Sequence, residues 1–410
     1  MAKKSFNSTI LHAGFQKPDA YGSISFPLYN SVSFDFESAE TMELAFSGKT
    51  LDHTYSRISN PTVEHFETQV KAITGAHGVT ALNSGMAAIS NTFFTVAKAG
   101  TNIVTSRHLF GNTYSFLANT LTAFDVEVRF CDLTNLSEVE KNINDKTCVL
   151  FLEIITNPQM EVANLKVLSE LCKKETIPLI ADTTIIPFCA FSALDFGIDI
   201  EVISSTKYIS GGATGTGGLI VDYGKFDWTK STRLRNLAQT EGKNAFNAKL
   251  RKEIHRNLGA YMTPQTAYMQ SLGLETLEVR YRRMSRTTKR LAERLAENPK
   301  IQRVNYTSLT GNRFKAISDK QFGEFAGAMF TIDLASKEAC FTFMNRLKII
   351  RRATNLFDNQ SLAIHPASTI YVNFTENECE AMNVSDKTIR FSVGLEEYEV
   401  LLADIEQALG

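Results

Sequence analysis

The chain has 410 residues, more than one compact core usually holds, so we expect two domains and a smaller appendage. Apolar residues make up 43% and charged residues 21%, as in a soluble globular enzyme. The net charge of −1 and the absence of a long Lys/Arg run disfavour nucleic acid and acidic membranes as partners.

The cysteines and the apolar stretches indicate a reduced cytoplasmic protein. None of the six cysteines forms a C-x-x-C pair or lies beside a histidine at zinc spacing, so we expect buried thiols and no metal site. Lys3 and Lys4 are not followed by an apolar run, so no secretory signal is expected. The most apolar stretch, 149–155, is far shorter than the roughly 20 residues of a membrane span.

Residues 1–60 are rich in Ser, Asn, Phe and Tyr and have weak periodicity. We therefore predict an irregular N-terminal arm that packs on another surface, such as a second subunit. Asn60 and Pro61 then predict a helix start, with Asn as the cap and Pro in the first turn, and Gly75 predicts its end.

Strand and helix patterns alternate from residue 79 to residue 205. This order predicts an α/β fold with a mostly parallel sheet wrapped by helices, and ligands bind such sheets at the carboxyl ends of the strands. The predicted strands are 79–82, 102–105, 126–130, 148–152, 177–181 and 202–205. The predicted helices between them are 84–97, 112–124, 135–142 and 165–174.

The character of the sequence changes after Asp222. A polar segment over 224–250 predicts an insertion of loops and helices, and long helical periodicity returns over 262–297. Further on, strands at 328–334 and 388–393 and a helix at 337–348 predict a smaller α/β domain. We accordingly predict an arm over 1–60, a larger domain over 61–255 and a C-terminal domain over 256–410.

Two charged residues follow predicted strands. Asp182 ends an apolar strand, and Lys207 follows the next strand. Taken singly, the aspartate is more simply a helix cap and the lysine a solvated side chain. Together they suit pyridoxal phosphate, which needs an amine to bond its aldehyde carbon and a carboxylate to keep its ring nitrogen protonated. Ser204 and Thr206 flank the lysine and could bind the cofactor's phosphate.

Two glycine-containing segments bear on the same question. Ser84, Gly85 and Met86 join a strand to a helix, so free backbone amides and the positive end of the helix dipole could bind the phosphate. An ordinary strand-to-helix turn is the alternative. The glycines of 211–218 match neither G-x-x-x-x-G-K-[ST] nor G-x-G-x-x-G, and we interpret them as a flexible turn beside Lys207.

Six spaced segments give the chain a resemblance to a known family. The chain resembles, over essentially its whole length, the Cys/Met-metabolism family of fold-type I pyridoxal-phosphate enzymes. This family includes cystathionine synthases and lyases, methionine γ-lyase and O-acetylhomoserine sulfhydrylase. The segments that carry the resemblance are Thr54–Thr62, Asn83–Met86, Ala181–Thr184, Ser204–Tyr208, His365–Ser368 and Arg390–Gly394.

The resemblance implies roles for individual residues. Lys207 is similar to the catalytic lysine that holds the cofactor as a Schiff base, and Asp182 to the partner of the ring nitrogen. Arg390 is similar to the arginine that grips the substrate α-carboxylate, and Asn355 lies where the substrate pocket closes. The phosphate cradle implied by the resemblance comprises Gly85, Met86, Ser204 and Thr206.

Three more residues take implied roles near the cofactor. Tyr55 and Arg57 are similar to residues that reach the phosphate in the neighbouring subunit, which requires at least a homodimer, and the family implies a homotetramer. Asn157 is similar to a residue near the cofactor's phenolic oxygen. Tyr55 is also a second candidate, after Lys207, for moving protons.

The sequence departs from the family pattern at Phe110. The family usually has a tyrosine there, whose ring stacks on the cofactor and whose hydroxyl assists proton transfer. A phenylalanine keeps the stacking, worth about 1 kcal/mol, but has no hydroxyl, so we expect Lys207 to carry most of the proton transfer. Asn112 stands where methionine γ-lyases characteristically have a cysteine.

The resemblance implies the activity as well. The polar insertion after Asp222 and the blocks 258–264 and 273–280 are similar to the O-acetylhomoserine sulfhydrylase branch. The implied reaction is γ-replacement, in which sulfide or a thiol displaces acetate from O-acetyl-L-homoserine and gives homocysteine or methionine. Methionine γ-lyase-type elimination and cystathionine γ-synthase activity are alternatives. A cofactor-binding regulator is a non-enzyme alternative, which intact Lys207, Asp182 and Arg390 disfavour.

Overall fold

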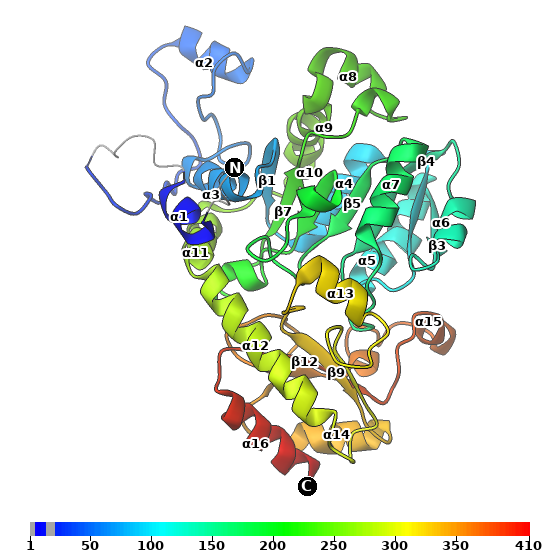
Figure 1. Ribbon diagram of the computed structural model, residues 1–410. Coiled ribbons are helices and arrows are strands. Elements are labelled where there is room, and N and C mark those ends of the chain that lie inside the picture. Colours follow the sequence, from blue (N-terminus) through cyan, green and yellow to red (C-terminus); the bar gives the residue numbers. More distant parts are fainter. Residues whose placement is uncertain (1–4, 14–20) are drawn as a thin grey trace.

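The computed structural model describes residues 5–13 and 21–410. Within them the chain builds two β-sheets, and a long helix runs beside the smaller sheet (Figure 1). Parts of the predicted N-terminal arm, residues 1–4 and 14–20, lie outside the described residues. No helix in the described part of the chain is long and apolar enough to cross a membrane.

The larger sheet has seven strands and confirms the predicted mostly parallel arrangement. Strands β3, β2, β4, β5 and β6 are parallel to their neighbours, while β7 runs antiparallel to both β6 and β1. The order across the sheet is β1 (Gly78–Leu82), β7 (Gly218–Asp222), β6 (Ile200–Ile203), β5 (Leu179–Asp182), β4 (Thr147–Glu153), β2 (Asn102–Ser106) and β3 (Glu127–Cys131).

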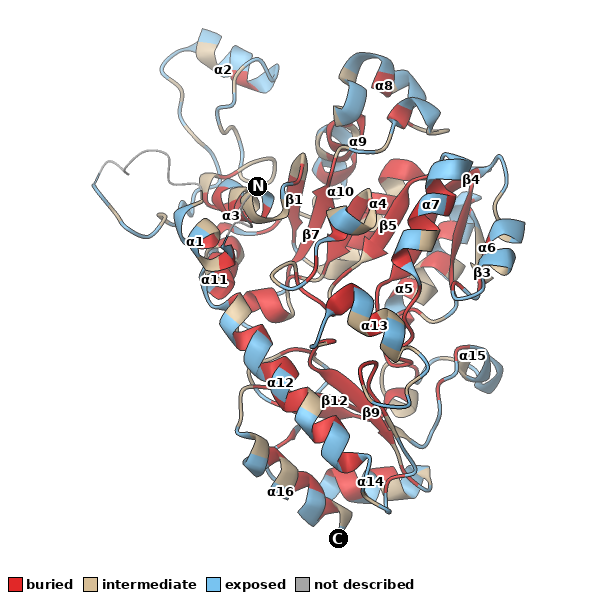
Figure 2. Ribbon diagram, viewed as in Figure 1, coloured by how far each residue is buried: buried red, intermediate tan, exposed pale blue. Residues whose placement is uncertain are grey.

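Most strands of the larger sheet are buried from end to end, because helices cover the sheet (Figure 2). Such strands read as apolar runs rather than as alternating patterns. The helices and irregular helical turns of this part are α4 (Gly85–Val96), α5 (Gly111–Ser115) continuing through 116–124, α6 (Leu136–Asn142), α7 (Leu165–Glu175), α8 (Arg235–Glu241), α9 (Ala245–Lys249) and α10 (Arg256–Leu258).

The smaller sheet has five strands. Its order is β10 (Arg351–Arg352), β11 (Leu362–Ile364), β12 (Thr388–Ser392), β9 (Met329–Asp333) and β8 (Arg303–Asn305). The helices of this part are α12 (Leu277–Leu295), α13 (Lys315–Phe322), α14 (Lys337–Arg346), α15 (Glu376–Ala381) and α16 (Tyr398–Leu409). The α/β character expected after residue 299 is thus confirmed, and the proposed domain boundaries stay predictions.

The N-terminal segment is less irregular than expected. It contains α1 (Phe6–His12) and α2 (Ala39–Phe46), so the expectation of an irregular arm was wrong for these stretches. Ser38 and Thr41 form a capping box that starts α2, and the buried Phe6 and Ile10 pack α1 into the core. The helix α3 (Pro61–Thr74) is capped by Asn60 at its start and by Gly75 at its end, as expected.

The helical periodicity over 262–297 belongs to two helices rather than one. The helix α11 (Pro264–Glu275) starts at the Thr263 cap, and Thr276 leaves the helical conformation before α12 begins. A Cβ at Gly273 would collide with the backbone carbonyl of Ile209. Glycine therefore lets α11 pack directly on the segment that follows Lys207.

Candidate active site

A cavity of about 620 Å³ lies where the carboxyl ends of the strands of the larger sheet face the smaller sheet. Cofactor and ligand pockets of soluble proteins are typically of this size. Every site residue predicted from the sequence lines it except Tyr55 and Arg57. These lining residues are Gly85, Met86, Phe110, Asn157, Asp182, Ser204, Thr206, Lys207, Asn355 and Arg390.

Lys207 is held where the two parts of the chain meet. It follows β6, and its Nζ donates a hydrogen bond of 2.8 Å to Oδ1 of Asn355, between β10 and β11. Burial, together with the positive charge of Arg390, lowers the pKa of Lys207 to about 8. A substantial fraction of the amine is therefore neutral near physiological pH, which a nucleophile or a base requires.

Asp182 ends β5 and accepts a hydrogen bond of 2.9 Å from the amide of Thr184. Burial raises its pKa, while the bonds from Thr184 and the charge of Lys207 oppose that rise. A buried carboxylate here would be stabilised by a cation placed in the cavity. The protonated ring nitrogen of pyridoxal phosphate is such a cation.

Glu153 is a cavity residue that the sequence analysis missed. It pairs with Asp182 in the register of β4 and β5, and its Oε1 accepts a hydrogen bond of 2.6 Å from the amide of Phe110. Burial raises the pKa of Glu153 well above its usual range, and the negative charge of Asp182 raises it further. Its only sequence signal was an acid inside the apolar stretch 149–155.

The start of α4 forms one wall of the cavity. Ser84 caps the helix by accepting a bond of 3.1 Å from Ala87, and the first amides of a helix have no partner inside it. A Cβ at Gly85 would lie 2.7 Å from Cβ of Ser204, so only glycine allows this approach. The hydroxyl of Thr206 already bonds both backbone groups of Gly217, so it holds the turn after β6 as well as facing the cavity.

Arg390 brings a positive charge to the opposite wall. It lies on β12, is only 2% exposed, and donates a bond of 3.1 Å to Oδ1 of Asn157 and one of 3.3 Å to the carbonyl of Asn355. Burial lowers its pKa to about 9. Across the described residues Arg390 forms no ion pair, and its Nε has no hydrogen-bond partner. A buried guanidinium in this state is suited to an anionic ligand.

Tyr55 and Arg57 lie away from this cavity within the chain. The side chain of Tyr55 is 41% exposed, and Arg57 donates a bond of 2.9 Å to the carbonyl of Arg256. Arg57 lines a separate cavity of about 730 Å³ between the segments 48–81 and 244–262. Their predicted contact with a neighbouring subunit therefore stays a prediction.

Residues 7–410 match the family described as Cys/Met metabolism PLP-dependent enzyme. The chain belongs to this family. Its fold is accordingly that of fold-type I pyridoxal-phosphate enzymes, and family membership makes pyridoxal phosphate its cofactor.

Individual family members with different activities resemble the chain over almost its full length. It is 34% identical to the L-methionine gamma-lyase of Fusobacterium nucleatum subsp. polymorphum, over 99% of this chain and 98% of the relative. A putative O-acetylhomoserine (thiol)-lyase of Campylobacter jejuni superposes with a TM-score of 0.92 at 30% identity, covering 99% of this chain and all of that one. That structure contains N'-pyridoxyl-lysine-5'-monophosphate.

A third family member has higher sequence identity. The O-acetylhomoserine sulfhydrylase of Wolinella succinogenes is 44% identical, with a TM-score of 0.77, covering 86% of this chain and 98% of that chain.

The residues of the cavity fit the family's cofactor. Lys207 supplies an amine of lowered pKa, Asp182 a buried carboxylate, and the start of α4 an anion-binding set of amides. The close approach of Gly85 to Ser204 brings the start of α4 to the end of β6. The cavity therefore offers a partner for the aldehyde carbon, the ring nitrogen and the phosphate of pyridoxal phosphate.

Proposed function

We propose that the chain catalyses γ-replacement on O-acetyl-L-homoserine, with sulfide or a thiol as the incoming nucleophile, giving homocysteine or methionine. The observation that carries the proposal is the buried Arg390, which forms no ion pair with any described residue and lines the same cavity as Lys207. This arrangement suits an amino acid whose α-carboxylate and α-carbon must be held at the same time. The 44% identity to the Wolinella succinogenes sulfhydrylase supports this choice within the family.

Three side chains of the cavity take distinct roles in the proposed reaction. When bound, pyridoxal phosphate supplies an electron-withdrawing ring that acidifies the protons near the amino group. The guanidinium of Arg390 binds the α-carboxylate and orients the substrate. Asp182 keeps its charge opposite the ring nitrogen. The Nζ of Lys207, with its lowered pKa, accepts the α-proton.

Proton transfer is the step at which this chain differs from the family pattern. Phe110 offers a ring for stacking but no hydroxyl, so Nζ of Lys207 also accepts the β-proton. Oδ1 of Asn355 is well placed to orient that amine between transfers, since it accepts a hydrogen bond from Nζ. Tyr55 of a second copy is the other candidate proton carrier.

Methionine γ-lyase activity is the second candidate. It is favoured by the 34% identity to the Fusobacterium nucleatum enzyme. In that reaction no thiol adds at Cγ: methionine loses methanethiol, and water hydrolyses the remainder to ammonia and 2-oxobutanoate. Asn112 lines the cavity where methionine γ-lyases characteristically have a cysteine, which counts against it. Cystathionine γ-synthase activity is a third possibility.

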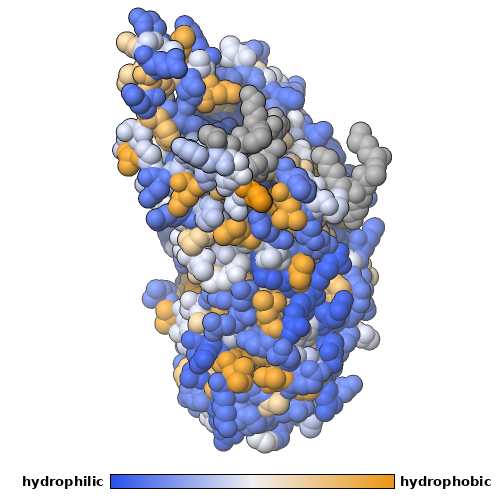
Figure 3. Space-filling view, turned by 90° about the vertical axis from the view of Figure 1, so that its left-hand side faces the viewer, coloured by the Kyte–Doolittle hydropathy of each residue, from blue (hydrophilic) through white to orange (hydrophobic). Residues whose placement is uncertain are grey.

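The active unit in this proposal is a homodimer, with a homotetramer as the complete assembly in the cytoplasm. Tyr55 and Arg57 reach the cofactor phosphate only from a second copy. The N-terminal segment also exposes several large apolar side chains, and Figure 3 shows hydrophobic side chains on the face that carries it. Among the most exposed are Ile24, Val32, Met42, Phe46 and Leu51. A second copy would cover them.

One assay distinguishes the candidate activities. The purified protein is incubated with O-acetyl-L-homoserine, with and without sulfide, and separately with L-methionine. Homocysteine that forms only with sulfide supports the replacement reaction. Rapid 2-oxobutanoate from methionine would instead identify a γ-lyase. Lys207→Ala serves as the inactive control. Visible absorbance of the bound cofactor verifies that the wild-type protein contains pyridoxal phosphate.

A further inference from the structure

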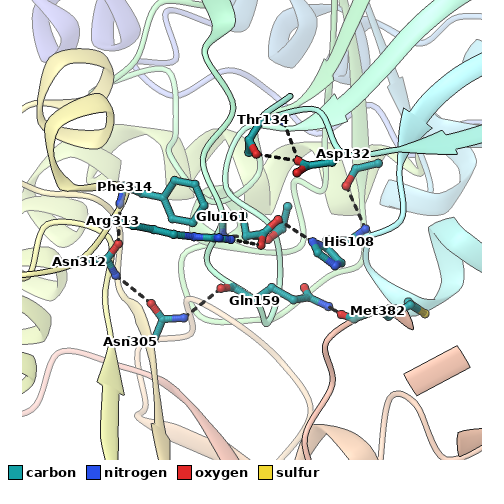
Figure 4. A network of polar contacts seen from close by, with 12 residues as sticks. His108, Asp132, Thr134, Gln159, Glu161, Asn305, Asn312, Arg313, Phe314 and Met382 are labelled. Carbon is teal, nitrogen blue, oxygen red and sulfur yellow. Dashed lines mark hydrogen bonds and ion pairs between the residues drawn. The ribbon is translucent and has the colours of Figure 1, made fainter. Parts of the chain in front are cut away.

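A buried carboxylate outside the cavity joins the two parts of the chain. Glu161 follows β4, at the end of the loop that carries Asn157, and points between His108 and Arg313 (Figure 4). Its Oε2 lies 2.5 Å from Nδ1 of His108, and its Oε1 accepts a bond of 2.5 Å from Arg313. Glu161 is only 9% exposed, and both of its carboxylate oxygens have a partner.

The two partners of Glu161 come from the two different parts of the chain. His108 stands two residues before Phe110, in the segment after β2 of the larger sheet. Arg313 precedes α13, in the part of the chain that builds the smaller sheet, and its guanidinium also lies 4.4 Å from the ring of Phe314. Glu161 thus connects the Phe110 segment to the other part of the chain.

Further hydrogen bonds reinforce the same junction. Gln159 donates a bond of 2.6 Å to the carbonyl of Met382, and Asn305 donates one of 2.9 Å to the carbonyl of Gln159 (Figure 4). The hydroxyl of Tyr371 lies 3.1 Å from the carbonyls of both Leu109 and Asn157. The cavity loops are therefore joined to the smaller-sheet part at several points, and the contact of Glu161 with Arg313 is the ion pair among these bonds.

The position of this junction matters because a substrate has to be held from both sides. Lys207 belongs to the larger-sheet part, and Arg390 lies on β12 of the smaller sheet. Arg390 also bonds Asn157, which lies four residues before Glu161 in the same loop. A shift between the two parts changes the separation of Arg390 and Lys207. A substrate that can no longer contact both residues at their best distances binds more weakly.

We propose that Glu161 is a positioning residue, which through His108 and Arg313 fixes the two sides of the cavity at the separation that an amino-acid substrate requires. It acts through Phe110 and Asn157 and does not touch the substrate. The inference rests on the proposed function only in that the ligand is an amino acid gripped by Arg390. The identity of its leaving group is immaterial.

The test compares charge-removing and charge-keeping variants of the holoenzyme. In Arg313→Met and Glu161→Gln, we expect the KM for the amino acid that the wild type turns over to rise about five- to tenfold, with kcat changed less. Lost uniform binding has this signature. Arg313→Lys keeps the charge and should recover much of the KM. The KM of the double variant should be no higher than that of the single variant with the higher KM, because both substitutions remove the same Glu161–Arg313 contact.

Arg129→Met is the matched control. Arg129 also bonds a glutamate, Glu127, at 2.9 Å, but both lie within β3 of the larger sheet and join no second part. Its KM should stay at the wild-type value. The proposal is overturned if Arg313→Met and Glu161→Gln leave KM unchanged, or if Arg129→Met raises it equally.

A second measurement needs no substrate. Hydrogen exchange of the holoenzyme should become faster in residues 156–161 and 307–314 in Arg313→Met, and unchanged there in Arg129→Met. High salt should also speed hydrogen exchange of these segments in the wild type, because the Arg313 side chain is 70% exposed and salt screens its charge. High salt should change the exchange of Arg313→Met little. Unchanged exchange in Arg313→Met contradicts the proposed role of Glu161 and Arg313. A wild type without activity on O-acetylhomoserine contradicts only the proposed function.

Discussion

The Nζ of Lys207 donates its hydrogen bond to Oδ1 of Asn355, at 2.8 Å, across the junction between the two parts of the chain. The partner is a neutral amide, so it orients the amine without stabilising its positive charge as a carboxylate would. Burial lowers the pKa of Lys207 to about 8, with Arg390 contributing. The neutral amine needed to react with the cofactor's aldehyde therefore becomes abundant near this pH.

Asn355→Asp should raise the pKa of Lys207, because it places a negative charge beside Nζ. We expect the rate of pyridoxal-phosphate uptake by the apoprotein to rise with pH, with a midpoint near 8 in the wild type. The variant's midpoint should lie about one pH unit or more higher. Stopped-flow absorbance over a pH series measures both midpoints.

Asn355→Ala is the control for this prediction. It removes the same hydrogen bond without adding charge, so its midpoint should stay closer to that of the wild type. Equal midpoints in Asn355→Asp and the wild type would show that the amide does not lie beside the reactive amine in solution.

Phe110→Tyr should slow the loss of the leaving group about tenfold while the cofactor stays bound. The cavity is built around a ring without a hydroxyl, and Lys207 is proposed to carry most of the proton transfer. An added oxygen takes space and leaves a polar group in need of a partner. Single-turnover release of acetate from O-acetylhomoserine, followed beside the cofactor's absorbance, measures the effect. A faster release would mean that a phenolic hydroxyl still assists this cavity.

The parts of the site that could be predicted from the sequence are those with local signals. Asp182 and Lys207 each follow an apolar run that reads as a strand, and the Ser84–Met86 turn joins a strand to a helix. Because parallel strands end at one edge, these residues were expected to meet, and they do line one cavity.

Residues that act through distant contacts gave no such signal. Arg313 lies 152 residues from Glu161 in the sequence, and no periodicity relates them. Glu153 read as an interruption of an apolar strand, and only the register with β5 places it beside Asp182. The helix α2 was missed because it buries little apolar surface, so that its capping box at Ser38 was the main available sign.

Asp404→Ala should lower the free energy of unfolding without changing the cavity. Asp404, on α16, accepts hydrogen bonds of 2.8–2.9 Å from the amides of Lys348, Ile349 and Ile350. Its removal leaves these donors without that acceptor, which we expect to cost about 3 kcal/mol. Urea unfolding measures the loss, and cofactor affinity under native conditions should stay at the wild-type value. Asp404→Asn, which keeps one acceptor oxygen, should lose less.

Glu153→Gln should become more stable relative to the wild type as the pH rises. Burial raises the pKa of Glu153 well above its usual 4.5, and Asp182 adds to that rise. Below pH 4.5 the carboxyl is protonated in both folded and unfolded chains, so its contribution to stability is complete there. As the pH rises, only the unfolded chain ionises readily, and the wild type loses about 1.4 kcal/mol per pH unit until the folded pKa is reached.

The glutamine variant cannot ionise, so it escapes this loss, although it has a weaker acceptor for the Phe110 amide. Urea unfolding of the apoproteins between pH 5 and neutrality, within the range above the usual pKa of 4.5, should show the difference growing in the variant's favour. A difference independent of pH would contradict the raised pKa.

Glu201→Gln distinguishes an effect on stability from an effect on the cofactor site. Glu201 is also fully buried with a raised pKa, but it bonds the hydroxyls of Thr183 and Tyr223 and does not line the cavity. Its stability should follow the same trend with pH, while the absorbance of its bound cofactor stays that of the wild type. Glu153→Gln should change that absorbance, because the acceptor that holds the Phe110 segment is altered. Identical cofactor spectra in all three proteins would leave Glu153 with a role in stability alone.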